Sequence, residues 1–259
     1  MDLKYIDLEI KDRLGYIWLN RAPYNDFDDE FLDEIIQAHH YMAAKDDAWG
    51  VLLCSRNEKY FSNGMEPDYL LQKDVEGRAA VFAKLFELMK VMYSFPKVEA
   101  SVITGHAMAG GAVLGIVTDF RFMGNGKYRY SFSEVRVGLT IPPGLLAIIE
   151  SVVGPENLVR VAMLAEAFKP EEALSIGLVD RVFEHEKTLE LSEKTMRSLL
   201  EMPQKSMRSV KKTIRQKYLQ SLDSLAGDQL NFFKNFLEGN LVEGLTAVKE
   251  RRRPQFQNP

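Results

Sequence analysis

Residues 104–112 read Thr-Gly-His-Ala-Met-Ala-Gly-Gly-Ala, and they follow an apolar run at 98–104. The run predicts a buried strand of a parallel sheet, and the glycines predict a turn that opens a helix. A second glycine-bearing turn, Tyr-Phe-Ser-Asn-Gly-Met-Glu at 60–66, follows another apolar run at 50–55. Two such turns at strand ends of one sheet can direct two backbone N–H groups at one oxygen atom, which is an oxyanion hole. The alternative is that the glycines only let helices pack closely on strands.

The rest of the chain alternates strands with helices as far as about residue 185 and is helical after that. We expect strands over residues 4–10, 14–20, 50–55, 98–104, 120–123, 128–132 and 178–183. We expect helices after the capping residue Asp28, over 78–93, 145–153, 155–164 and 170–176, and throughout 187–253, including 225–236. This order predicts an α/β core at residues 1–195, followed by a helical region at 196–259.

Composition excludes several classes of protein. The chain has 259 residues, a net charge of −4 and 46% hydrophobic residues, so we expect a globular protein without a basic surface for nucleic acid. Its longest apolar run, around 107–117, is too short for a membrane span of about 20 residues. The single cysteine, Cys54, lies in an apolar run and is expected to be buried and inert. Because the first residues carry no basic segment followed by an apolar stretch, we expect a cytoplasmic protein.

Sequence signatures of three enzyme classes are missing. The chain has no Gly-x-x-x-x-Gly-Lys-[Ser/Thr] loop and no Gly-x-Ser-x-Gly turn, and its four histidines lack the spacing of metal ligands. These features argue against an NTPase, a serine hydrolase and a metalloenzyme, and we expect no bound metal.

Six segments together resemble the crotonase (enoyl-CoA hydratase/isomerase) superfamily. They are residues 20–25 (NRAPYN), 61–65 (FSNGM), 105–111 (GHAMAGG), 132–139 (FSEVRVGL), 173–180 (ALSIGLVD) and 251–256 (RRRPQF). The resemblance covers nearly the whole chain, and the order and spacing of the segments make it specific. It implies a crotonase-like spiral of ββα units with C-terminal helices. The helical region at 196–259 would then build a homotrimer or a dimer of trimers.

The same resemblance implies that the substrate is an acyl-CoA thioester and that no separate cofactor is needed. The backbone N–H groups of Met65 and Gly110 would hold the thioester oxygen while it becomes an enolate. One such donor is typically worth about 3–4 kcal/mol of transition-state stabilisation. Since only the backbone takes part, the side chain at Met65 is free to vary within the family.

The number of carboxylates divides the family. Members that hydrate double bonds use two glutamates, one on the helix after the glycines and one on a later strand–turn segment. Here the first position falls on Val113, which cannot transfer a proton, and the second falls on Glu134. One carboxylate beside an enolate hole can remove a proton from C2 and return it at C4. The pattern therefore resembles the Δ3-Δ2-enoyl-CoA isomerase branch, with Glu134 as a base whose pKa an apolar pocket would raise.

Residues that contact the substrate are also implied by the resemblance. The opening segment would hold CoA through Arg21, Ala22 and Tyr24. Phe232 and Arg251 match an aromatic residue and a cation that can reach the CoA of a neighbouring subunit, although both also suit simple packing. Around the thioester and the acyl chain we expect Asn63, Gly64, Gly111, Val113, Leu139, Ile141, Pro142 and Leu145.

Other functions remain open from the sequence. A hydratase with an unrecognised second acid, or a decarboxylase that depends on the enolate hole more than on a base, would use the same fold. A non-catalytic acyl-CoA-binding or RNA-binding paralogue is a further alternative, and the acidic balance and the intact Glu134 weigh against it. Two other acids, Glu66 and Asp119, are expected to make local hydrogen bonds rather than to act in catalysis.

Overall fold

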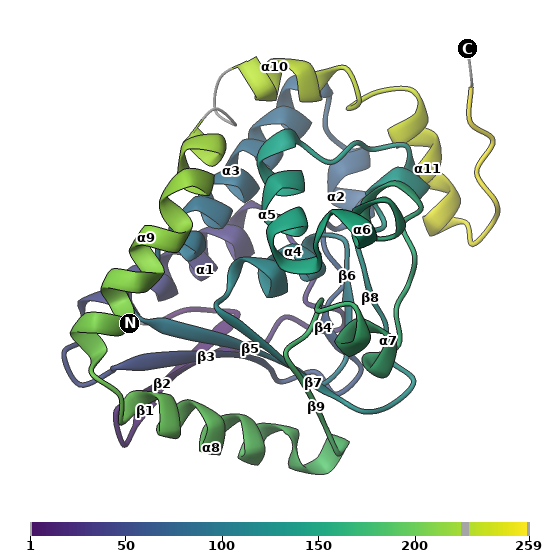
Figure 1. Cartoon of the computed structure of the whole chain (residues 1–259). Helices are drawn as coiled ribbons and strands as arrows, with labels where there is room; N and C mark the ends of the chain where they lie inside the picture. The colour runs from purple at the N-terminus through teal and green to yellow at the C-terminus, as the bar shows by residue number, and fades with distance from the viewer. Residues whose placement is uncertain (1, 224–227, 258–259) are drawn as a thin grey trace.

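The computed structural model describes residues 2–223 and 228–257, which form a six-stranded sheet with helices on both faces (Figure 1). The strands are β1 Ile6–Lys11, β2 Leu14–Leu19, β3 Gly50–Ser55, β4 Tyr60–Ser62, β5 Val98–Ile103, β6 His106–Met108, β7 Phe120–Gly124, β8 Tyr130–Ser131 and β9 Arg181–Phe183. The α-helices are α1 Asp29–Ala44, α2 Pro67–Leu71, α3 Val75–Tyr93, α4 Gly110–Val117, α5 Pro143–Val153, α6 Pro155–Leu158, α7 Pro170–Ser175, α8 Thr188–Leu200, α9 Gln204–Asp223, α10 Asp228–Lys234 and α11 Asn240–Lys249. Shorter helical segments are η1 Glu134–Val137, η2 Val159–Met163 and η3 His185–Lys187.

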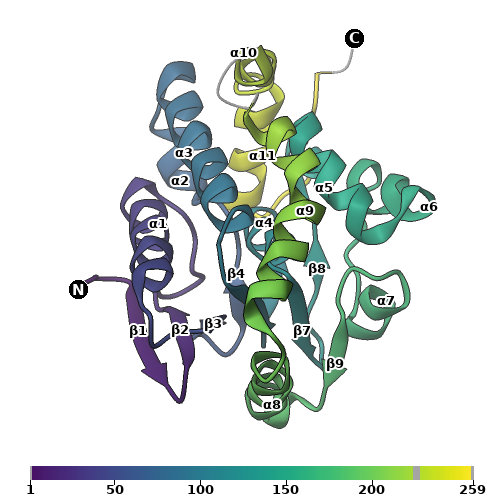
Figure 2. The same ribbon diagram turned by 60° about the vertical axis from the view of Figure 1, so that its left-hand side comes forward.

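The larger sheet has the strand order β1-β2-β3-β5-β7-β9. β1 runs antiparallel to β2, and the other neighbouring strands are parallel. Every residue of β3 and β5 is buried, as expected for strands that are covered on both faces. α8 contacts β3, β5, β7 and β9 from below, whereas α1 and α4 pack on the sheet from above (Figures 1 and 2). The predicted α/β class is confirmed.

A second sheet of three short parallel strands, in the order β4-β6-β8, is not predicted by the sequence. β4 and β6 fall in the stretches that the sequence predicts to be turns, because two or three residues are too few to show a strand pattern. The strand predicted at 128–132 is likewise reduced to β8. The carboxyl ends of β4 and β6 lie at the same edge of this small sheet. The two glycine turns therefore meet there, and not at the edge of the larger sheet.

The last strand is shorter than the run at 178–183 predicts. The N–H groups of Leu178 and Val179 both donate to the carbonyl oxygen of Ala173, at 2.8 and 3.3 Å. These bonds close the end of α7, so pairing with β7 begins only at Arg181.

The helices of the C-terminal half also differ from the prediction. The helix predicted over 155–164 is α-helical in α6 and continues as the π-helix η2. The continuous helical stretch predicted over 187–253 is divided into α8, α9, α10 and α11, and Pro203 stands in the first break because proline cannot continue a helix. Of the helix predicted at 225–236, residues 225–227 lie outside the described residues, and α10 accounts for most of the rest.

After α8, the helices α9, α10 and α11 return along the upper side of the molecule (Figure 2). α9 packs on α3 and α5, α10 packs on α3, and α11 packs on α2 and η1. Phe233, Leu241 and Leu245 of these helices join the same hydrophobic core as the sheet and α3. The last two helices therefore help to enclose the interior of the α/β core.

Asp119 fastens α9 to the sheet. Its carboxylate accepts a hydrogen bond from the backbone N–H of Glu99 at 2.8 Å, which confirms the local role predicted for it. The same carboxylate pairs with Lys211 at 2.6 Å and with Arg215 at 2.8 Å, both on α9. All three charged side chains are largely buried. The positive charges of Lys211 and Arg215 are therefore compensated by the carboxylate of Asp119.

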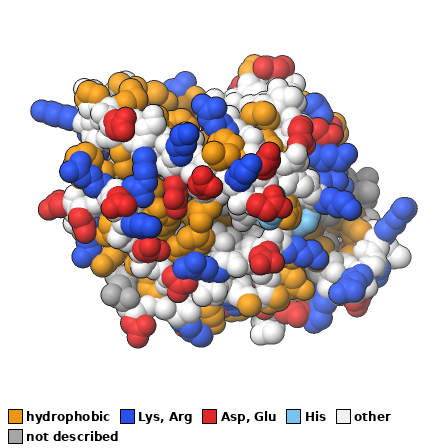
Figure 3. Space-filling model, turned by 90° about the horizontal axis from the view of Figure 1, so that it is seen from below, with side chains coloured by type: hydrophobic (Ala, Val, Ile, Leu, Met, Phe, Trp, Pro, Cys, Tyr) orange, Lys and Arg blue, Asp and Glu red, His pale blue; other side chains and the backbone are white. Residues whose placement is uncertain are grey.

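The surface carries charges of both signs. Seen from below, acidic and basic side chains are intermingled over the face that Figure 3 shows, in keeping with the small net charge. No helix in residues 2–223 or 228–257 combines the length and the apolar character needed to cross a lipid bilayer.

Replacing Asp119 with asparagine removes the charge that two buried cations share. We expect the free energy of unfolding to fall by about 3 kcal/mol, because breaking a buried ion pair leaves its partners uncompensated. Urea unfolding measures the change. The matched control is Asp7→Asn, which removes an exposed pair with Arg56 and is expected to have little effect. Equal effects of the two substitutions would contradict an anchoring role for Asp119.

Candidate active site

The first candidate donor lies where β6 turns into α4. Gly110 is the first residue of α4, so its N–H has no partner within the helix. The preceding residue, Ala109, has a φ of +46°, which residues other than glycine rarely adopt. The N–H of Ala109 itself donates to the carbonyl oxygen of Ser131 at 2.8 Å. In this strained turn the N–H of Ala109 pairs with the small sheet. The N–H of Gly110 pairs neither with the small sheet nor within α4.

The second candidate donor lies just after β4. Met65 forms an isolated parallel bridge with Phe27. The neighbours of Met65 make the two hydrogen bonds of this bridge: Phe27 N–H donates to Gly64 O at 2.7 Å, and Glu66 N–H donates to Phe27 O at 3.0 Å. The bridge therefore holds the backbone in place without using the N–H of Met65.

The two turns are in direct contact. Gly64 has a φ of +85°, and a methyl group added to it would lie 2.7 Å from the backbone nitrogen of Gly110. A methyl group added to Gly111 would lie 2.1 Å from the carbonyl oxygen of Ser62. Real side chains do not come so close, so glycine is required at both positions. The absence of these side chains lets the two free N–H groups approach one another.

The opening segment at 20–25 supports the turn that carries Met65. Asn25 is fully buried and donates through Nδ2 to the carbonyl oxygen of Phe61 at 3.0 Å. Arg21 pairs through Nη2 with Asp28 at 2.7 Å and with Glu66 at 2.9 Å. The prediction that Glu66 acts locally is thus confirmed. The guanidinium of Arg21 is held by two carboxylates of its own chain.

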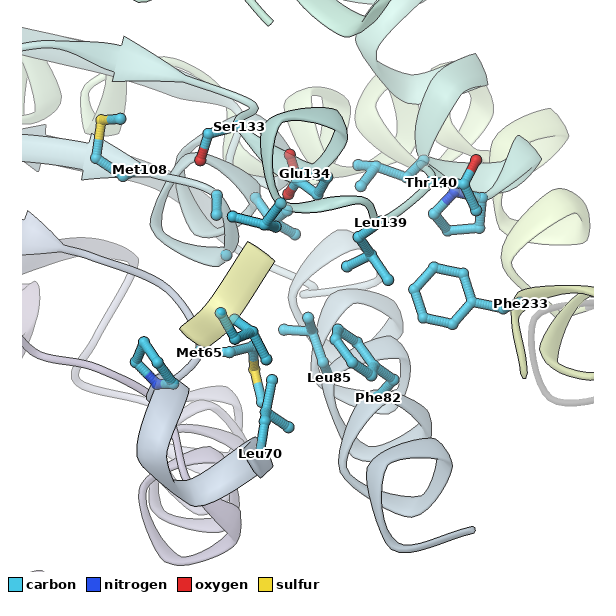
Figure 4. Close-up of a pocket in the computed structure, with 18 of the residues that line it drawn as sticks. Met65, Leu70, Phe82, Leu85, Met108, Ser133, Glu134, Leu139, Thr140 and Phe233 are labelled. Atoms are coloured by element: carbon cyan, nitrogen blue, oxygen red, sulfur yellow. The ribbon is translucent and has the colours of Figure 1, made fainter. Parts of the chain in front are cut away.

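A cavity of about 270 Å³ opens beside the two donors (Figure 4). The residues that line it are Asn63, Met65, Pro67, Leu70, Phe82, Leu85, Phe86, Met89, Met108, Ala109, Gly110, Val113, Ser133, Glu134, Val137, Leu139, Thr140, Pro142, Leu145, Phe233, Leu245 and Val248. Most of them are apolar. Within this described lining, Glu134 is the one ionisable side chain, so the cavity holds a single acid–base group beside the two donors.

Glu134 is the first residue of η1 and is 8% exposed. Its Oε2 atom has no hydrogen-bond partner among the described residues. Because burial removes the water that would stabilise the ionised form, it raises the pKa of Glu134 to about 7. A carboxyl group with such a pKa can both accept and release a proton near neutral pH.

α11 fixes the segment that carries Glu134. A methyl group added to Gly244 would lie 2.3 Å from the carbonyl oxygen of Val137, so the backbone of α11 packs directly on η1. α11 also contacts α2, and Lys249 Nζ lies 2.6 Å from a carboxylate oxygen of Asp68. Since α2 follows the Met65 turn, α11 connects the segment that holds Glu134 to the segment that holds the second donor, Met65.

Residues 9–259 match the family model described as enoyl-CoA hydratase/isomerase. The chain belongs to the enoyl-CoA hydratase/isomerase family. It is therefore an enzyme of that family by descent, and the predicted crotonase relationship is confirmed.

Relatives in the enoyl-CoA hydratase/isomerase family carry more than one activity in their names. The chain is 27% identical to a trans-2-decenoyl-[acyl-carrier-protein] isomerase of Streptococcus mutans, over 99% of both chains. The human mitochondrial delta3-delta2-enoyl-CoA isomerase structure superposes with a TM-score of 0.92 at 22% identity, covering 96% of this chain and 98% of that one. An enoyl-CoA hydratase structure from Mycobacterium avium subsp. paratuberculosis gives 0.86 at 22% identity, covering 99% and 100%. These two structural matches establish the fold alone.

The cavity brings together most of the residues predicted around the thioester. Asn63, Met65, Gly110, Val113, Glu134, Leu139, Pro142 and Leu145 line it. Gly64 and Gly111 form the turns behind it, and Ile141 is buried outside the lining.

The residues predicted to hold CoA lie elsewhere. Arg21, Ala22, Tyr24, Phe232 and Arg251 do not line the cavity in the described chain. Tyr24 and Phe232 are each nearly half exposed, and the side chain of Arg21 is engaged as described above. Roles of these residues in binding CoA within one subunit or between subunits stay predictions.

The far wall of the cavity is missed by sequence reasoning. Phe82, Phe86 and Met89 of α3 line it together with Phe233 of α10. The three α3 residues recur at helical spacing, which correctly predicts a buried stripe. The pattern does not distinguish a stripe that fills the core from one that borders a cavity, because the difference depends on which elements pack against α3.

Glu134→Gln replaces a buried acid with a neutral side chain of the same shape. The folded protein holds the proton of Glu134 more tightly than the unfolded chain, so this residue costs stability as the pH rises through about 7. We expect the variant to exceed the wild type in unfolding free energy by about 3 kcal/mol at pH 8 and by less than about 1 kcal/mol at pH 5.

Urea unfolding at the two pH values measures this difference. The matched control is Glu150→Gln, at an exposed position on α5, for which we expect little change at either pH. A stability difference for Glu134→Gln that is the same at pH 5 and pH 8 would contradict the burial of an ionisable base.

Proposed function

We propose that the chain is an enoyl-thioester isomerase that shifts a double bond from C3 to C2, with Glu134 as its single acid–base group. The observation that carries the proposal is the composition of the cavity: two unused backbone N–H groups and one ionisable side chain. These are the groups that an enolate mechanism needs.

The proposed reaction moves one proton. The Glu134 carboxylate removes a proton from C2 of the 3-enoyl thioester, and the electron pair passes into the thioester, whose oxygen becomes negative. The N–H groups of Met65 and Gly110 donate to that oxygen in a site from which water is largely excluded. The dienolate then takes the same proton from Glu134 at C4, which leaves the double bond between C2 and C3 and restores the carboxylate.

The composition of the cavity lining argues against hydration. Adding water across a double bond needs one group that deprotonates the water and another that protonates the substrate. The second acid would occupy the position of Val113, which is apolar, buried and part of the cavity lining. A decarboxylase would depend on the donors without needing Glu134, so the two alternatives differ in their dependence on this residue.

The carrier of the acyl group offers a second candidate. CoA and acyl-carrier protein present the same phosphopantetheine thioester. The relative from Streptococcus mutans, which matches this chain over 99% of both lengths, is named for an acyl-carrier-protein substrate. The Arg21 side chain is already paired with two carboxylates, so it does not offer a free cation to a CoA phosphate. We retain acyl-CoA as the proposed substrate and acyl-carrier protein as the alternative.

Assembly and location complete the proposal. By its family, we propose a homotrimer or a dimer of trimers in which residues 196–259 take part in subunit contacts, with a cytoplasmic location and no separate cofactor.

The direct test uses purified protein with a 3-enoyl-CoA and, separately, a 2-enoyl-CoA, followed by the absorbance of the conjugated thioester. We expect 3-enoyl-CoA to be isomerised and 2-enoyl-CoA not to be hydrated. Glu134→Gln is expected to reduce kcat by a factor of at least about 100, because it removes the one acid–base group among the described residues of the cavity lining. Efficient hydration by the wild type would overturn the proposal, and full isomerase activity of the variant would overturn the role of Glu134 as the base.

The carrier is tested by comparing kcat/KM for one 3-enoyl group on CoA and on acyl-carrier protein. We expect the CoA thioester to be turned over at least as efficiently, since the donors and Glu134 contact only the acyl end. The Glu134→Gln variant measures the background with each carrier. A tenfold or greater preference for acyl-carrier protein would replace CoA with the second candidate.

A further inference from the structure

Three aromatic rings close the end of the cavity that lies away from the donors. Phe233 is 1% exposed, and its ring meets those of Phe82 and Phe86 edge-on, at centroid distances of 5.0 and 5.4 Å. Edge-to-face contact is a favoured arrangement for aromatic rings. Figure 4 shows the ring of Phe233 pointing into the cavity from the side opposite Met65 and Met108. The rings therefore form a wall at the far end.

The path from the base to this wall suits a hydrocarbon chain. In Figure 4, Leu139 lies between Glu134 and Phe233. The polar side chains of the lining are Asn63, Ser133, Glu134 and Thr140, and no cation is among the described lining residues. A carboxylate or a hydroxyl group in the substrate tail would lose its hydration there without gaining a charged partner. The tail that fits is an unsubstituted alkyl chain.

The size of the cavity limits the length of that chain. A protein cavity of about 150 Å³ accommodates benzene, with six carbon atoms. In proportion, the cavity of about 270 Å³ holds on the order of ten carbon atoms.

We propose that Phe233 is a specificity-determining residue that restricts the substrate to medium-chain acyl groups of roughly eight to ten carbons. This inference rests on the proposed function, because it assumes that an acyl thioester occupies the cavity. It assigns to α10 a task separate from catalysis, which is to set where the acyl chain must end.

The test measures binding, and it does not require turnover. Saturated acyl-pantetheines of four to fourteen carbons are titrated into the full-length protein by calorimetry, since pantetheine is common to both carriers. In the wild type we expect each added methylene group to lower Kd about three- to fourfold up to about ten carbons, and further carbons to give no gain. In Phe233→Ala we expect the gain to continue for about two to four more carbons, because the removed ring leaves space.

Two further variants keep the test decisive. Phe233→Leu removes less of the side chain, so it tolerates folding better and is expected to shift the limit by a smaller amount. Phe122→Ala is the matched control, because Phe122 is equally buried but belongs to a separate hydrophobic cluster that does not line the cavity. This control should lose stability and keep the wild-type limit.

The outcomes separate this inference from the proposed function. An unchanged limit in both folded Phe233 variants, or the same shift in Phe122→Ala, would overturn the role of Phe233. A limit near ten carbons that moves in the Phe233 variants, in a wild type that does not isomerise 3-enoyl-CoA, would support the chain-length role and reject the isomerase. Isomerisation without any chain-length limit in binding would support the isomerase and reject the chain-length role.

Discussion

The contact between the two glycine turns is the constraint on which the rest of the site depends. Gly111 lies against the backbone of Ser62, and Gly64 lies against that of Gly110, with no room for a side chain at either place. Two N–H groups from distant parts of the sequence are brought together in this way. The small sheet aligns the ends of β4 and β6, the Phe27 bridge fixes the Met65 turn, and the strained Ala109 sets the start of α4. Each of these features positions one of the two turns at that contact.

Glu134, in contrast, lowers the stability of the folded protein. A carboxyl group with an unpaired, buried oxygen weakens the folded state when it is ionised, and functional sites commonly carry such a cost. Compensation comes from elsewhere in the molecule. The C-terminal helices extend the hydrophobic core over η1, and Asp119 ties α9 to the sheet through two buried cations. The direct packing of Gly244 on Val137 fixes η1, the segment that carries Glu134.

The sequence predicts those parts of the site that depend on local pattern. The glycine turns and Glu134 occur in segments whose order and spacing identify the family, and Val113 comes two residues after one of these segments. The main sheet and the reacting end of the cavity can therefore be predicted. The small sheet does not follow, because its strands are two or three residues long. Nor do the positive φ of Ala109 and the ion pairs of Arg21, which arise from residues brought together by folding. The far wall of the cavity cannot be predicted from the sequence for a related reason. Phe86 and Phe233 are recognisable as buried, but the cavity that they share depends on how α3 and α10 pack.

The position of Phe233, Leu245 and Val248 in the chain has a consequence for the order in which the protein matures. Synthesis runs from the N-terminus, so the two donors and Glu134 leave the ribosome before α10 and α11 exist. A nascent chain at that stage has its reactive groups but no closed cavity, and its apolar interior is still open to water. The thioester can be enclosed only after the last helices dock. A working site is therefore acquired only after more than 100 residues beyond Glu134 have been synthesised, because α11 begins at Asn240.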